Sequence, residues 1–124
     1  MSSPALRDRY LADSINTASP GKLLVMLYDR LVMDLMQGEE ALRAGSREQA
    51  ADKLTHAQEI ILELRTTLDL DAWSGAPGLA NLYGFLLTEL IGANIRREAD
   101  RVAACRALVE PLRDAWREAA AQSS

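Results

Sequence analysis

Residues Thr17 to Asp29 read Thr-Ala-Ser-Pro-Gly-Lys-Leu-Leu-Val-Met-Leu-Tyr-Asp, and this stretch combines a helix start with a long apolar block. Ser19 is a favourable N-cap, because its hydroxyl can accept a hydrogen bond from an unpaired amide of the first turn. Pro20 suits the first helical position, where its φ is already helical and its missing N–H loses no hydrogen bond. We therefore expect a long helix over residues 19–43.

The apolar residues of this helix exceed what one bundle core can cover. At about 100° per residue, one stripe within roughly 40° of Leu24 contains Leu24, Tyr28, Leu31, Leu35 and Leu42. Other apolar residues fall well outside that stripe, including Val25, Met26, Val32 and Met33. A helix that is apolar nearly all round either is buried on every side or presents part of its surface to a partner. These four residues are therefore candidates for binding a partner.

Helical periodicity predicts three further helices, over residues 47–67, 76–97 and 99–121, with one apolar stripe each. Gly45 can take the left-handed position that ends the first helix, and Pro111 is expected to bend the last helix without breaking it. Four helices with short connections predict an all-α, antiparallel four-helix bundle over residues 19–121. Residues 1–18 are expected to form a mobile N-terminal arm or short helix, and residues 122–124 a frayed tail.

The third predicted helix also has apolar residues left over. Leu87, Ile91 and Ile95 form a row spaced by four, at about 100° to 180° from the core centre. Small residues form an adjacent row, at Gly84, Thr88 and Gly92. An apolar ridge beside a smooth shelf would let another helix approach closely. Because the surplus occurs on the first and third helices only, it favours a partner-binding groove.

Composition excludes several classes of protein. The 124 residues carry 14 Lys and Arg against 18 Asp and Glu, a net charge of -4 that argues against a nucleic-acid partner. The sequence offers neither a signal peptide nor an apolar run of the roughly 20 residues that a membrane span requires. A single cysteine fits a reducing compartment. We expect a cytoplasmic protein that does not insert into a membrane.

The chain does not have the residue pattern of a bundle enzyme. A carboxylate-bridged di-iron site needs two Glu-x-x-His pairs, whereas His56 is the only histidine and has Lys53 three residues before it. His56 is expected on a solvated back of the second helix with Asp52, Glu59 and Glu63. Cys105 falls on the core stripe of the fourth helix. We therefore expect a binding module with no enzymatic activity, no cofactor and no metal.

Several motifs resemble those of the FliS-like flagellar export chaperones. The hallmark is Thr17-Ala-Ser-Pro followed by Leu23-Leu-Val-Met-Leu-Tyr-Asp29. Further similar segments follow in the same order and spacing, at residues 57–64, 68–71, 81–85, 93–94 and 112–116. The resemblance extends from about Tyr10 to Glu118. The chain departs from the family pattern at Arg30, where a glycine is common, and at Pro111.

This resemblance implies a cytoplasmic helical bundle around which the disordered C-terminal segment of flagellin wraps. Such a chaperone blocks premature polymerisation of flagellin, aids its secretion and has no enzymatic activity. In the family a tyrosine of the N-terminal arm can contact the groove or the flagellin tail, and Tyr10 matches that position. The expected partner-binding residues are Tyr10, Ile15, Val25, Met26, Val32, Met33, Leu87, Ile91 and Ile95.

Alternatives to a flagellin chaperone stay open at this point. A helical adaptor or homodimer could bury the same apolar stripes against itself, and a metal-dependent bundle enzyme is a remote third class. For the chaperone we expect a monomer or weak homodimer. A co-chaperone or a protein of the flagellar export machinery is left open as a second partner.

Overall fold

A computed structural model describes residues 20–122, which form four α-helices. These helices are α2 (Pro20–Arg43), α3 (Arg47–Thr67), α4 (Ala76–Arg96) and α5 (Ala99–Gln122). Each predicted helix agrees with the observed one to within one residue at either end. The predicted N-terminal arm and the last two residues of the predicted tail lie outside the described residues.

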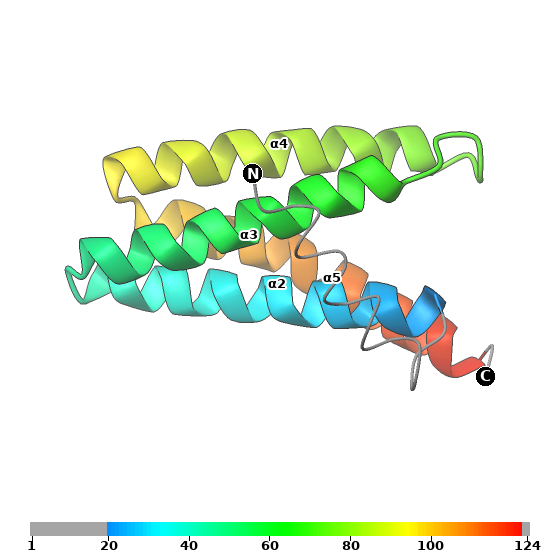
Figure 1. Ribbon diagram of the computed structural model, residues 1–124, viewed down its shortest axis with the longest axis horizontal. Helices are drawn as coiled ribbons and strands as arrows, with labels where there is room; N and C mark the ends of the chain where they lie inside the picture. Colours follow the sequence, from blue (N-terminus) through cyan, green and yellow to red (C-terminus); the bar gives the residue numbers. More distant parts are fainter. Residues whose placement is uncertain (1–19, 123–124) are drawn as a thin grey trace.

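The four helices form an antiparallel bundle, as the sequence predicts (Figure 1). Helix α2 packs against α3 and α5, and α4 packs against the same two helices on the other side. Helices α2 and α4 therefore lie diagonally across the bundle, and they meet only through side chains in its interior. This arrangement determines which surfaces can form one groove.

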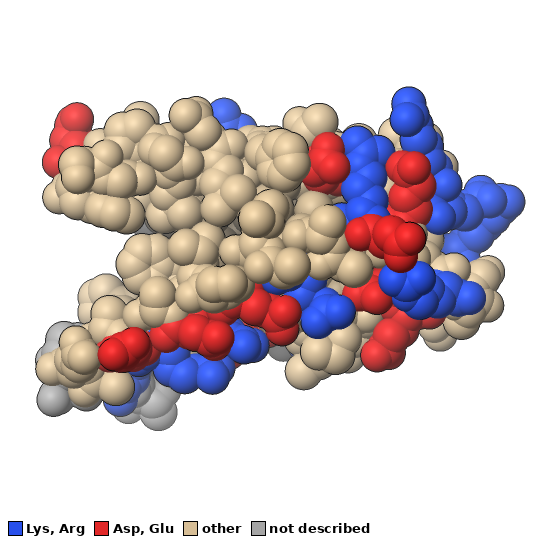
Figure 2. All heavy atoms as spheres, turned by 180° about the vertical axis from the view of Figure 1, so that it is seen from behind, with Lys and Arg blue, Asp and Glu red and all other residues tan. Residues whose placement is uncertain are grey.

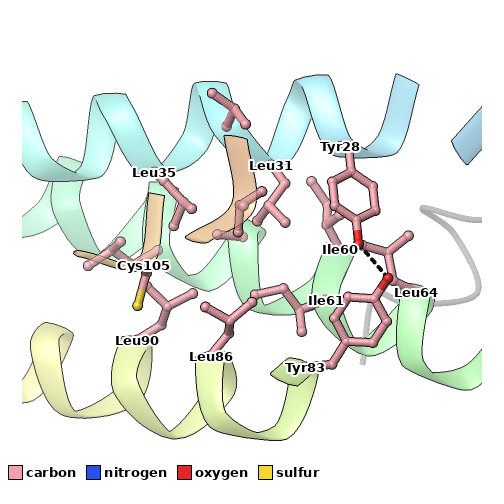
Figure 3. Close-up of a cluster of buried hydrophobic side chains, with 14 of the residues drawn as sticks. Tyr28, Leu31, Leu35, Ile60, Ile61, Leu64, Tyr83, Leu86, Leu90 and Cys105 are labelled. Carbon is pink, nitrogen blue, oxygen red and sulfur yellow. Dashed lines mark hydrogen bonds between the residues drawn. The ribbon is translucent and has the colours of Figure 1, made fainter. Parts of the chain in front are cut away.

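The interior of the bundle is built from the predicted stripes (Figure 3). All four helices contribute fully buried side chains, among them Leu31, Leu35, Leu54, Ile61, Leu86, Leu90, Val102 and Val109. At one end the buried hydroxyls of Tyr28 and Tyr83 lie 2.6 Å apart and share a hydrogen bond between α2 and α4. Burial raises the pKa of both phenols, so the pair stays neutral.

Two turns show how local chemistry ends the helices. Gly45 has a φ of +78° after α2, as predicted, and the Ser46 amide donates to the Ala41 carbonyl at 2.8 Å. At the end of α4 a non-glycine residue, Arg97, takes the left-handed conformation with φ 57° and ψ 52°. Pro111 is exposed and α5 runs through it, so the predicted continuity of the helix is confirmed.

The predicted solvated back of α3 is wrong at two positions. Nδ1 of His56 is hydrogen-bonded to Oδ2 of Asp34, a carboxylate of α2 whose side chain is fully buried. Glu63 is also buried. Both residues lie on the shoulder of α3 that packs on α2, which a wheel of α3 alone does not reveal. Burial raises the pKa of Asp34, and the hydrogen bond from His56 opposes that rise.

Candidate protein-binding site

An apolar pocket of about 460 Å³ opens at the end of the bundle where α2 and α4 begin. All four helices and the connection from α3 to α4 contribute to its wall, and Glu63, Thr67 and Asp69 add polar groups. The apolar and aromatic lining consists of Pro20, Leu23, Leu24, Leu27, Leu64, Leu68, Trp73, Leu79, Tyr83 and Trp116. Seen from behind, the molecule has a notch below α4 at this end (Figure 2).

Aromatic rings form one wall of this pocket. Trp116 meets Tyr28 edge-on, with ring centroids 6.2 Å apart, and meets Trp73 edge-on at 6.5 Å. Trp73 lines the pocket and remains half exposed, so it stands at the rim. A Cβ at Gly75 would lie 1.9 Å from the Trp73 ring, so any other residue at position 75 would displace the ring.

Sequence reasoning missed this pocket because periodicity gives the direction of a side chain and says nothing of what lies opposite. Leu24 is predicted as core, yet it is only partly buried and lines the pocket. The bundle interior is open at this end because α3 ends at Thr67 and α4 begins only at Ala76, so a non-helical connection lies between them. The position of both tryptophans of the chain near helix ends is the one sequence signal that could have indicated it.

The predicted partner-binding residues of α2 occupy different environments. Val25 and Met26 are partly buried, and Met33 is 44% exposed. Val32 is 3% exposed and belongs to the core, so its predicted exposure is wrong. The reason is that α2 lies between α3 and α5, which bury a wider arc of its surface than a single stripe.

The predicted residues of α4 are more open. Ile91 is 47% and Ile95 is 72% exposed, whereas Leu87 is partly buried and packs against the core. Helices α2 and α4 both line the pocket at the end of the bundle, but along the rest of the bundle they are diagonal, so the exposed residues Met33, Ile91 and Ile95 lie on separate surfaces. Tyr10 and Ile15 lie outside the described residues.

The structure adds exposed apolar residues that the sequence did not single out. Phe85 of α4 is 51% and Leu108 of α5 is 44% exposed. Arg101 of α5 pairs with Glu89 of α4, and two turns further along these antiparallel helices Leu108 comes level with residues 82–85. Figure 2 shows the result as a broad uncharged surface over α4 and the adjoining part of α5.

Charged side chains close one end of this surface. Arg101 donates to Glu89 at 3.0 and 3.1 Å and to Glu98 at 3.0 Å, and these hydrogen bonds from Arg101 lower the pKa of Glu89. The same guanidinium covers Gly92, where a Cβ would lie 2.4 Å from Nη1. At Gly84 no atom lies within 4 Å of that position. The predicted shelf of small residues is therefore open at Gly84 and covered at Gly92.

A helical bundle with an open apolar pocket and separate apolar helix faces defines a class of protein, the helical protein-binding modules. No helix in the described range 20–122 is long and apolar enough to cross a membrane. Within the same range, no three His, Cys, Asp or Glu side chains gather closely enough to hold a metal ion.

Comparisons with known proteins identify the family. A family model described as flagellar protein FliS matches residues 2–123. The flagellar secretion chaperone FliS of Bacillus subtilis is 32% identical over 110 residues, covering 89% of this chain and 82% of that protein. The chaperone of the same name from Vibrio cholerae is 27% identical, covering 82% and 76%. A flagellar chaperone of known crystal structure shares the fold, with a TM-score of 0.75 at 23% identity over 93% and 94% of the two chains.

The chain belongs to the FliS family of flagellar secretion chaperones. This family is non-enzymatic, which confirms the interpretation as a binding protein. The motif of residues 17–29 therefore identified the family correctly.

Proposed function

We propose that this chain is a cytoplasmic chaperone that binds the C-terminal segment of flagellin, blocks its premature polymerisation and aids its secretion. One observation carries the proposal: the bundle has an apolar pocket at one end and separate apolar faces on α2 and α4. A compact partner could contact only one of these surfaces. A segment that is disordered when free can wrap around the bundle and contact all of them.

The pocket supports this proposal by its size. Its volume of about 460 Å³ lies within the range of ligand-binding pockets, so it can accept two or three large apolar side chains. Burying each such side chain contributes about 1.5–3 kcal/mol. Part of that gain is offset by the ordering of the segment, and a complex of micromolar affinity or better is expected.

We place the N-terminal arm, with Tyr10 and Ile15, at the same pocket. The arm joins the bundle at Pro20, which itself lines the pocket. Tyr10 lies ten positions before Pro20 in the sequence, and an extended chain of ten residues spans up to about 33–36 Å. Tyr10 can therefore reach the pocket and compete with flagellin for it in a monomer.

A titration with a synthetic peptide of the flagellin C-terminal segment tests the proposal. The free peptide should be disordered and should gain helicity on binding, as followed by circular dichroism and calorimetry. Ile91→Asp should weaken the complex at least tenfold, because it puts a charge into an apolar contact. It should leave the melting temperature nearly unchanged, because Ile91 is 47% exposed. Thr55→Asp, on the exposed face of α3, is the control and should bind normally.

The rival interpretation predicts a different pattern. A homodimer or adaptor that buries its own apolar faces would be a stable dimer by analytical ultracentrifugation. If the peptide fails to bind at micromolar concentration and the free protein is such a dimer, the chaperone proposal is wrong. A large loss of stability in Ile91→Asp would show that Ile91 belongs to the core.

A further inference from the structure

The connection from α3 to α4, residues 68–75, is the non-helical part of the pocket wall. It contributes Leu68, Asp69 and Trp73 to the lining. Trp73 is the largest of these side chains and is 50% exposed, although it stands beside an apolar cavity. The ring therefore has apolar surface left that a change of position could bury.

Backbone hydrogen bonds shape this connection without fixing the Trp73 side chain. The Ala72 amide donates to the Asp69 carbonyl at 3.1 Å, and the Ala76 amide donates to the Trp73 carbonyl at 3.1 Å. The indole makes no hydrogen bond within residues 20–122, and its ring meets Trp116 of α5 edge-on with centroids 6.5 Å apart. Because the turn is held by its backbone, the ring can change rotamer while the turn stays intact.

Gly75 leaves the space in which the Trp73 ring rests. Three atoms of the benzo edge, Cε3, Cζ3 and Cη2, lie within 2.6 Å of the place that a Cβ of residue 75 would take. The backbone does not require glycine there, because φ −83° and ψ −10° suit any residue. Residue 75 is also the N-cap of α4, where serine or aspartate would add a hydrogen bond that glycine cannot make. What glycine provides is room for a ring folded back on its own chain at the rim of the pocket.

We propose that Trp73 is a hinged lid: its ring rests against Gly75 while the pocket is open and turns over the mouth once an apolar side chain has entered. This inference deepens the proposed function and rests on it, because the entering side chain is taken to belong to the flagellin segment. Turning buries the half-exposed ring against the occupant, so closure is favoured when the pocket is filled. The lid therefore slows the departure of the segment more than its arrival.

Nuclear Overhauser effects test the movement in the unaltered protein. In the free protein the benzo protons of Trp73 should give strong effects to the Hα protons of Gly75, against which the ring rests. When the unlabelled flagellin C-terminal peptide is added to the isotopically labelled protein, these effects should disappear and effects from the Trp73 ring to the peptide should replace them. If the effects to Gly75 persist in the complex, Trp73 is a fixed wall and the inference is overturned.

Binding kinetics provide a second test. Trp73→Ala should raise koff of the peptide at least tenfold and change kon less than threefold, because the lid closes after entry. Leu70→Ala is the matched control, since Leu70 is a 54% exposed apolar residue of the same connection that does not line the pocket. It should change both rate constants less than twofold. A loss of affinity in Trp73→Ala that lies mainly in kon, or an equal effect of Leu70→Ala, would contradict the lid.

A third test needs no ligand. Gly75→Ala removes the resting place of the ring, so the ring should move over the pocket and become less accessible. In Trp116→Phe, Trp73 is the only tryptophan, and the acrylamide quenching constant of its fluorescence should fall about twofold when Gly75→Ala is added. Gly78→Ala is the control and should leave quenching unchanged, because no atom lies within 4 Å of its Cβ position. An unchanged or larger constant in Gly75→Ala would overturn the inference. Should Trp116→Phe fail to fold, 5-fluorotryptophan spectra of the chain with both tryptophans measure the same accessibility.

The two proposals fail in different ways. If the peptide does not bind the unaltered protein, flagellin binding itself is wrong, and the quenching of Gly75→Ala still decides whether the ring has a second position over the pocket. If the peptide binds while the Trp73 ring stays against Gly75, flagellin binding stands and only the lid is wrong.

Discussion

Replacing Gly38 with alanine should destabilise the bundle, although alanine is the better helix former. Gly38 is buried in α2 and faces Leu54 of α3, whose side chain is fully buried. A Cβ at Gly38 would lie 2.7 Å from Cδ2 and 3.1 Å from Cγ of Leu54. Alanine gains about 1 kcal/mol of helix propensity, whereas overpacking costs about 1–3 kcal/mol and α2 and α3 must separate to relieve it. We expect a net loss of about 1 kcal/mol, or roughly 4 °C in melting temperature.

Urea and thermal unfolding followed by circular dichroism measure this change. Gly84→Ala is the matched control, because it lies inside α4 and has no atom within 4 Å of the new Cβ. It should stabilise the protein by about 0.5–1 kcal/mol. If Gly38→Ala gains as much stability as Gly84→Ala, the close packing of α2 on α3 at this position is refuted.

Three further predictions concern stability and reactivity. Burial acts to raise the pKa of Glu39, but hydrogen bonds from Arg106 and Arg43 outweigh it and the pKa is lowered. The ionised Glu39 side chain therefore contributes its full stabilisation at pH values above its pKa in the unfolded chain. This contribution is lost as the pH falls through its lower pKa in the folded protein. Glu39→Gln should lose about 1 kcal/mol at neutral pH by urea unfolding, and the difference should vanish in acid. Arg97→Gly should gain about 0.5–1 kcal/mol in the same assay, since glycine relieves the left-handed conformation; unchanged stability would contradict this. Burial raises the pKa of Cys105 to about 11, so its reaction with a thiol reagent should follow unfolding, and rapid reaction of the native protein would place it outside the core.

The helices and their stripes could be predicted from the sequence because both depend on local chemistry. Ser19 and Pro20 marked the start of α2, and Gly45 marked its end by requiring a positive φ. Periodicity then placed Tyr28, Leu31 and Leu35 in the core, where they are fully buried. These features are decided within a few residues along the chain.

The features that depend on which helices are neighbours could not be predicted in the same way. Val32 and His56 were assigned to open faces, yet α3 and α5 enclose α2 and bury Val32, and His56 of α3 packs onto Asp34 of α2. The pocket and the exposed Phe85 and Leu108 depend on where neighbouring helices end, which a helical wheel does not contain. The exposure of Ile91 and Ile95 was predicted correctly, because helical periodicity places both on the side of α4 that faces away from its core stripe.

Binding of intact and truncated flagellin tests the central claim most directly. The protein would be mixed with full-length flagellin and with flagellin lacking its C-terminal segment, and complexes would be measured by calorimetry while filament growth is followed by light scattering. The proposed function predicts a one-to-one complex with full-length flagellin, suppressed filament growth and no binding of the truncated form. Equal binding of both forms would contradict it.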